Sequence, residues 1–97
     1  MRQIAPACGV VAVSKAGRDA GRSFVILPVV DDQYVLIADG ELRKVQNPKR
    51  KKLRHLSIRP YVAQEIRQCL QQQKLLMDSD VRKALAAFEQ AEQKEEG

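Results

Sequence analysis

The cations of this chain are concentrated in two short segments, and these are the residues whose types and spacing could do chemistry. The first segment, residues 14–23, contains Ala-Gly-Arg twice at a spacing of four. Glycine allows positive φ angles and a close backbone approach to a ligand, and the planar fork of arginine fits phosphate oxygens. Five residues of this loop are therefore candidates for binding RNA: Lys15, Gly17, Arg18, Gly21 and Arg22. In the alternative reading, the glycines only turn a hairpin and Arg18 pairs with Asp19.

The second segment, residues 43–55, carries seven cations and one histidine within 13 residues. Such a run is typical of a nucleic-acid contact. Its members are Arg43, Lys44, Lys49, Arg50, Lys51, Lys52, Arg54 and His55. The lysines after Pro48 are expected on a loose stretch, as diffuse point charges that bind RNA or as a solvated loop that only keeps the protein soluble. His55 could contact RNA, or it could be a packed, hydrogen-bonded residue beside leucines.

The charge of the chain is distributed unevenly. Residues 1–60 contain 12 Lys and Arg against 5 Asp and Glu, whereas residues 61–97 contain 5 against 7. A local positive field of this kind favours a polyanionic partner. Aromatic residues are scarce at 4%, and Phe24 and Tyr34 are expected in the core. Because single-strand readers stack bases on exposed aromatic rings, the composition favours recognition of the phosphates and shape of a folded RNA, with little base readout.

The sequence offers little to an enzyme. General acid–base and nucleophilic catalysis need positioned pairs of side chains, but the single histidine lies in a basic run with no carboxylate near it in sequence. Cys8 and Cys69 are far apart and lack zinc-site spacing, so we expect reduced thiols, no metal and no cofactor. No apolar run is long enough to span a bilayer. We therefore expect a non-enzymatic cytoplasmic protein without a membrane contact.

The elements that must position the cations begin with short β-strands. Apolar runs of five to seven residues bounded by turn residues are the signature of strands. The expected strands are residues 9–13, 24–30, 34–38 and 41–45, with turns at 31–33 and at Asp39-Gly40. A last apolar segment, 53–58, changes its spacing, which predicts a bulge or a 3₁₀ turn. Five short strands in about 50 residues predict a small barrel, since closure removes exposed edges.

From residue 60 onward the pattern becomes helical. Pro60 suits a helix start, and Asp78 to Asp80 offer an N-cap for a second helix. Val81, Leu85 and Phe88 follow at i, i+4 and i+7, which places them on one helix face. The sequence therefore predicts a mostly β domain at residues 1–60 and a C-terminal extension of one or two helices at residues 61–97.

Taken together, the residues resemble those of KOW-domain proteins, in particular the L14e-like group of ribosomal proteins and its small bacterial relatives. The resemblance covers roughly residues 8–58 and depends on a Gly-Arg-x-x-Gly-Arg loop followed in order by a Lys-x-x-His-Leu ending. It implies an SH3-like barrel whose first long loop contacts structured RNA. Lys15, Gly17, Arg18, Gly21 and Arg22 match that loop, and Lys52, Arg54 and His55 match the basic ending. The helical tail lies outside the resemblance.

The function expected from the sequence is non-enzymatic binding of structured RNA, with ribosomal RNA as the expected partner and association with the ribosome in translation. Ribosomal proteins could contact the helical tail. The alternative is a protein–protein adaptor of the transcription or translation machinery, which docks through the barrel or the tail.

Overall fold

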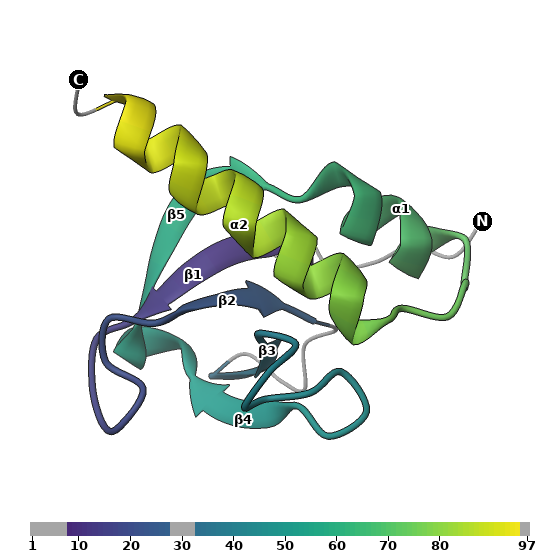
Figure 1. Ribbon diagram of the computed structural model, residues 1–97. Helices are drawn as coiled ribbons and strands as arrows, with labels where there is room; N and C mark the ends of the chain where they lie inside the picture. Colours follow the sequence, from purple (N-terminus) through teal and green to yellow (C-terminus); the bar gives the residue numbers. More distant parts are fainter. Residues whose placement is uncertain (1–7, 28–32, 96–97) are drawn as a thin grey trace.

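A five-stranded antiparallel sheet carries two helices on one of its faces (Figure 1). The structure is a computed structural model that describes residues 8–27 and 33–95. The strands are β1 (Val10–Ser14), β2 (Ser23–Ile26), β3 (Tyr34–Ala38), β4 (Lys49–Lys52) and β5 (Leu56–Val62). A 3₁₀ turn, η1 (Leu53–His55), joins the last two strands, and the helices are α1 (Gln64–Gln71) and α2 (Asp78–Glu95).

The strand order is β4-β3-β2-β1-β5, so β4 and β5 are the two edges of the sheet. Successive side chains of a strand point to opposite faces of the sheet. The continuous apolar runs of β1 and β2 therefore place apolar side chains on both faces. Val11 pairs with Val25, and Ala12 pairs with Phe24. Each pair belongs to a different buried cluster, one on each face of the sheet.

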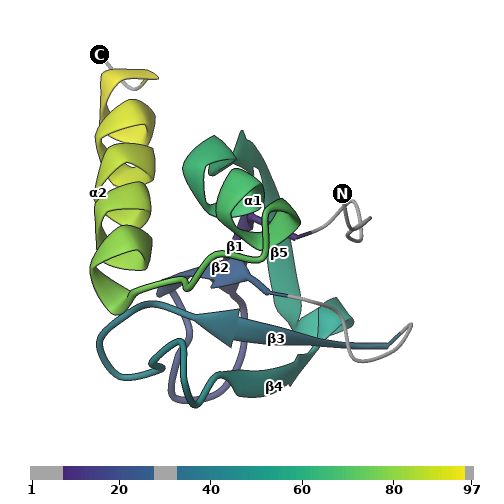
Figure 2. The same ribbon diagram turned by 90° about the vertical axis from the view of Figure 1, so that its right-hand side faces the viewer.

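The cluster on the face away from the helices shows that the sheet is strongly bent. It consists of Ala12, Phe24, Ile26, Val35, Ile37 and Leu56. Leu56 of β5 packs here with residues of β3, although β2 and β1 lie between these strands in the sheet. Figure 2 shows β3 and β4 running across the direction of β5. The sheet is nevertheless not closed, since β4 and β5 do not pair within the described ranges, and the expected barrel is therefore not confirmed.

The second cluster fixes the helices to the sheet. Val81, Leu85 and Phe88 of α2 are buried against the sheet as their spacing predicted, and Ile66 contributes from α1. The ring of Phe88 meets the ring of Tyr61 edge to face, with 5.4 Å between centroids. Burying each large apolar side chain stabilises the fold by about 1.5–3 kcal/mol. The helices and the sheet thus share one core.

The expected fourth strand, residues 41–45, is wrong. This segment is a loop, and β4 is formed instead by the cationic residues Lys49–Lys52. The reason is that side chains take the backbone N–H groups which a strand would use. Asp39 Oδ1 accepts hydrogen bonds from the N–H groups of Glu41 and Arg43, both at 2.9 Å. Asp78 Oδ1 accepts another from the N–H of Val45 at 2.7 Å.

Other expectations are met more closely. β3 has the expected bounds, the 3₁₀ turn occurs at residues 53–55, and α2 begins at the expected cap, where Asp80 Oδ2 accepts a hydrogen bond from the N–H of Met77.

The first helix begins later than expected, because Pro60 belongs to β5 and the helix starts at Gln64. β2 ends at Ile26, and residues 28–30 of the expected second strand, like Asp31 and Asp32 of the expected turn, lie outside the described residues.

Candidate nucleic-acid interface

The cations of β4 are divided between the two faces of the sheet. Lys49 pairs with Ile37 and Lys51 with Val35, whereas Arg50 pairs with Leu36 and Lys52 with Tyr34. Because neighbouring strand residues point to opposite faces, Lys49 and Lys51 share one face, and Arg50 and Lys52 share the other. The basic run is therefore an ordered strand, which corrects the expectation of a loose stretch of diffuse charges.

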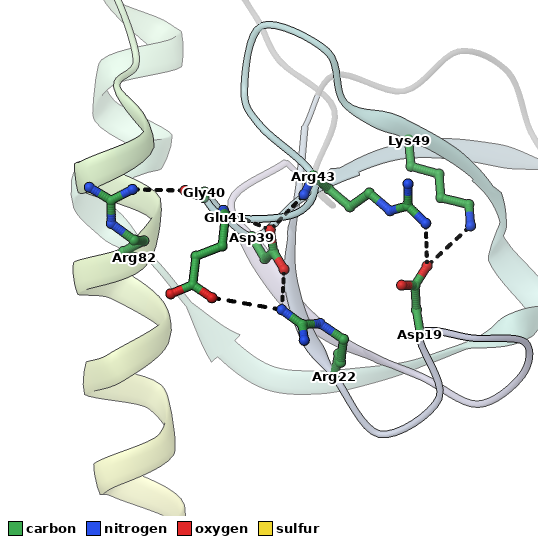
Figure 3. A network of polar contacts seen from close by, with 8 residues as sticks. All are labelled: Asp19, Arg22, Asp39, Gly40, Glu41, Arg43, Lys49 and Arg82. Atoms are coloured by element: carbon green, nitrogen blue, oxygen red, sulfur yellow. Dashed lines mark hydrogen bonds and ion pairs between the residues drawn. The ribbon is translucent and has the colours of Figure 1, made fainter.

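Lys49 and Lys51 hold the loop 14–23 in place. Lys51, only 9% exposed, donates a hydrogen bond from Nζ to the carbonyl oxygen of Ala16 at 3.2 Å. Lys49 Nζ and Arg43 Nη2 both bind Asp19 Oδ2, at 3.1 and 3.2 Å (Figure 3). Asp19 is buried, and its ionic partners come from β4 and the loop before it. Of the alternative reading, the Arg18–Asp19 pair is wrong, since the salt bridges of Asp19 among the described residues go to Arg43 and Lys49. The hairpin itself is present, because β1 and β2 pair antiparallel on either side of this loop.

Arg22 is held by a second buried carboxylate. Its Nη2 lies 2.8 Å from Asp39 Oδ2 and 3.8 Å from Glu41 Oε2. Asp39 also accepts the two backbone hydrogen bonds that turn the loop after β3, so this single carboxylate joins loop 14–23 to the loop after β3 (Figure 3). Arg22, Arg43 and Lys49, all RNA-binding candidates from the sequence, thus have intramolecular anionic partners. Contact of these three residues with RNA stays a prediction.

The two buried aspartates are ionised in the fold. Burial disfavours their charge, but hydrogen bonds from Lys49 and Arg43 outweigh it at Asp19, and the pKa of that carboxyl lies below its ordinary value of 3.8. Burial likewise opposes ionisation of Asp39, and the bonds from Arg22 and from the backbone of Arg43 and Glu41 lower its pKa below 3.8.

The free energy of unfolding is therefore expected to fall when the solution is acidified. A carboxyl whose pKa is lower in the folded than in the unfolded chain contributes stability above its unfolded-state value, and this contribution is lost as the pH falls through the folded-state value. The urea midpoint of the wild type should drop steeply below about pH 4, beyond the smaller decline below about pH 6.5 that a lowered pKa of His55 adds.

The double substitution Asp19→Asn with Asp39→Asn tests the origin of this pH dependence. It should cost about 1–3 kcal/mol for each carboxylate at neutral pH and should flatten the acid limb of the urea-midpoint curve. Glu65→Gln, which removes an exposed carboxylate of α1, is the control and should keep the wild-type curve. An unchanged acid limb in the double variant would contradict the assignment to Asp19 and Asp39.

The remaining candidate cations are open to solvent. Lys15, Arg18, Lys44, Arg50 and Arg54 are exposed, and Lys52 and His55 are half-buried. Within residues 8–27 and 33–95, no salt bridge involves any of them.

Several of these solvent-accessible residues lie around His55. The backbone N–H of Lys15 donates to the His55 carbonyl oxygen at 2.8 Å, which joins loop 14–23 to η1. Desolvation lowers the pKa of His55 below its ordinary 6.5, and the cations Arg54, Lys52, Lys51 and Lys15 lower it further, because protonation would add a charge to a positive field. We call these five residues the basic patch: Lys15, Lys52, Arg54 and His55, which reach solvent, and the buried Lys51, which adds its charge to the field. It can attract a polyanion from solution.

The glycines of loop 14–23 have the conformation expected of them. Gly17 and Gly21 have φ angles of +77° and +87°, a region that side chains other than glycine rarely adopt. A Cβ placed on Gly21 would meet no atom within 4 Å, so this side of the loop is open to a ligand. Arg18, which lies between the two glycines, is exposed.

The sequence reasoning missed one residue of this surface. Tyr34 was expected in the core, but it is half-buried, and the guanidinium carbon of Arg50 lies over its ring at 4.0 Å from the centroid. The signal available in the sequence was its place at the first position of a strand, where one face of the sheet can reach solvent.

Other kinds of site are not formed by the described residues. No three His, Cys, Asp or Glu side chains of this part of the chain gather as a metal ion requires. None of its helices combines the length and apolar character needed to cross a bilayer.

The chain matches no protein-family model and no curated protein sequence. The arrangement of the side chains, together with the resemblance described above, is therefore the basis for a proposed function.

Proposed function

We propose that the protein is a non-enzymatic RNA-binding protein whose basic patch and loop 14–23 bind the phosphate backbone of structured RNA. The observation that carries the proposal is the grouping of three solvent-accessible cations, Lys15, Lys52 and Arg54, beside His55, where the backbone hydrogen bond from Lys15 joins loop 14–23 to η1. Lysine and arginine side chains near the phosphate backbone release its condensed counterions and supply most of the affinity. Arg18 and Arg50, which lie near members of the patch in the sequence, are exposed as well.

The proposal includes a finer assignment of the fold, an SH3-like barrel of the KOW type. Two features support it besides the resemblance. The 3₁₀ turn lies between the last two strands, and Leu56 of β5 belongs to the same buried cluster as Val35 and Ile37 of β3. With this assignment, loop 14–23 is the RNA-contacting loop of the fold, ribosomal RNA is the expected ligand, and the cytoplasm is the expected compartment.

Salt dependence tests the electrostatic mechanism. If four to six phosphates are neutralised, the logarithm of the binding constant should fall against the logarithm of salt concentration with a slope of roughly −3 to −5. Fluorescence polarisation with a labelled hairpin RNA measures this slope. Neutralising Lys15 and Arg54 by Lys15→Gln and Arg54→Gln should make the slope less steep by about 2. A slope near zero for the wild type would count against the proposal.

A second candidate function is a protein–protein adaptor of the transcription or translation machinery. The segment between α1 and α2 favours it, since the side chains of Leu75 and Met77 are 77% and 52% exposed. Figure 1 shows this segment at the opposite end of the molecule from loop 14–23. The two functions are therefore separable: Leu75→Ser with Met77→Ser should leave RNA affinity unchanged and would abolish only a protein contact.

A further inference from the structure

We propose that Tyr34 and Arg50 form a stacking site for one unpaired nucleobase, so that the protein prefers a folded RNA with an unpaired nucleotide beside its helix. The inference rests on the proposed RNA binding and names the kind of RNA that this surface selects. It also departs from the expectation of little base readout, which depended on a buried Tyr34.

The pleat of β3 and β4 brings the two side chains together. Tyr34 lies opposite Lys52, and Arg50 lies opposite Leu36, so all four project from the same face of the sheet. The guanidinium carbon of Arg50 lies 4.0 Å from the ring centroid, and Lys52 Nζ lies 6.0 Å from it. No salt bridge within the described ranges draws Arg50 away from the ring.

A hollow of about 490 Å³ lies beside Lys52, the residue opposite Tyr34 on β4. Of the described residues, those that line it are Gln33, Lys52, Leu53 and Arg54. Gln33 precedes Tyr34 in the chain, and Leu53 and Arg54 are the first two residues of η1. The exposed Leu53 supplies an apolar wall, and its backbone N–H is already bonded to the Gln33 carbonyl oxygen at 2.8 Å. Lys52 and Arg54 place two cations at the rim.

This combination of groups suits a nucleotide better than a phosphate alone. A phosphate needs only cations, whereas a base needs a flat or apolar surface for its ring. Bases stack on tyrosine rings and on arginine guanidinium planes when they are unpaired and splayed out of a helix. The Tyr34–Arg50 pair and Leu53 provide the surface, and Lys52 and Arg54 can hold the phosphates on either side of the base. Since a paired base is already stacked within its helix, an unpaired nucleotide is the ligand this site fits.

The test compares three hairpin RNAs with the same stem: one fully paired, one with a single bulged 2-aminopurine and one with an abasic residue at the bulge. The wild type should bind the bulged RNA roughly tenfold more tightly than the abasic RNA, and stacking should quench the 2-aminopurine fluorescence. Tyr34→Leu should lose both the preference and the quenching while its affinity for the fully paired stem stays unchanged. Tyr34→Phe, which keeps an aromatic ring, should retain both.

Arg50→Lys provides a second line of evidence that does not depend on Tyr34→Leu being folded. It keeps the charge but removes the guanidinium plane, so it should lower the ratio of the affinities for the bulged and the abasic RNA, two ligands that share the same stem. Equal binding of the bulged and abasic RNAs by the wild type, with the paired stem still bound, would overturn the stacking site alone. Failure of the wild type to bind any of the three RNAs would overturn the proposed function as well.

Discussion

Gly40→Ala is expected to lower the free energy of unfolding by roughly 3 kcal/mol or more. Gly40 has a φ of +80°, and a Cβ built there would lie 2.5 Å from the carbonyl oxygen of Asp78 and 2.9 Å from Cγ of Arg82. The first of these atoms belongs to the backbone of α2, so the methyl group can be accommodated only if the helix and the loop move apart. That movement would loosen the packing of α2 on the sheet and strain the hydrogen bond from Arg82 Nη1 to the Gly40 carbonyl oxygen, which is 2.8 Å long (Figure 3).

Gly21→Ala is the matched control for this prediction. Gly21 has a similar φ of +87°, but a Cβ there would meet no atom within 4 Å. Its substitution should therefore cost only the backbone strain, about 1–2 kcal/mol. Thermal unfolding of both variants measures the difference, since about 1 kcal/mol corresponds to a shift of roughly 4–8 °C in a domain of this size. Equal losses in the two variants would show that contact between the Gly40 loop and α2 does not matter.

The regular elements that the sequence predicts well are those whose stability is local in origin. The apolar run at β3 is bounded by turn residues, and α2 combines a cap at Asp80 with an apolar face through Val81, Leu85 and Phe88. In both elements, the residues that begin or end the element and the apolar residues that bury it lie within the same short stretch of sequence. Such elements can be recognised without knowledge of the rest of the chain.

The fourth strand could not be predicted because its determinants are distant or unusual. Residues 41–45 are held as a loop partly by Asp78, whose carboxylate reaches the N–H of Val45 across 33 positions of sequence. The strand that does form, Lys49–Lys52, has no apolar or β-branched residue and is ordered by its pairing with β3. Periodicity and β-propensity carry no sign of such a strand.

The composition of the candidate site was predictable, whereas its organisation was not. The two cationic segments stand out in the sequence, but which of their members are open to a ligand depends on the register of β4 and on Asp19. That carboxylate takes Arg43 and Lys49, which lie 24 and 30 positions away. The sequence therefore offers 13 equivalent candidates, and the structure divides them into residues that hold the loops and residues that face solvent.

Reversing two charges of the basic patch is expected to reduce the affinity for structured RNA by roughly 100-fold or more. A hydrogen bond to a charged group contributes about 1.5–3 kcal/mol, and each 1.4 kcal/mol is about a factor of ten in affinity. Lys15→Glu with Arg54→Glu removes two such contacts from exposed positions next to His55. Because both side chains are exposed, the fold should be retained, which circular dichroism can verify.

The direct test of the central claim is to compare this variant with Lys74→Glu and Lys83→Glu by polarisation titration of one hairpin RNA at one salt concentration. Lys74 and Lys83 are also exposed, but they lie before and within α2, so the two double variants have the same net charge and differ only in where it lies. Binding through the basic patch predicts a loss of roughly 100-fold for the first variant and less than about tenfold for the second, from its long-range field alone. Equal losses in the two variants would show that only total charge matters, and would contradict the claim that RNA binds at the basic patch.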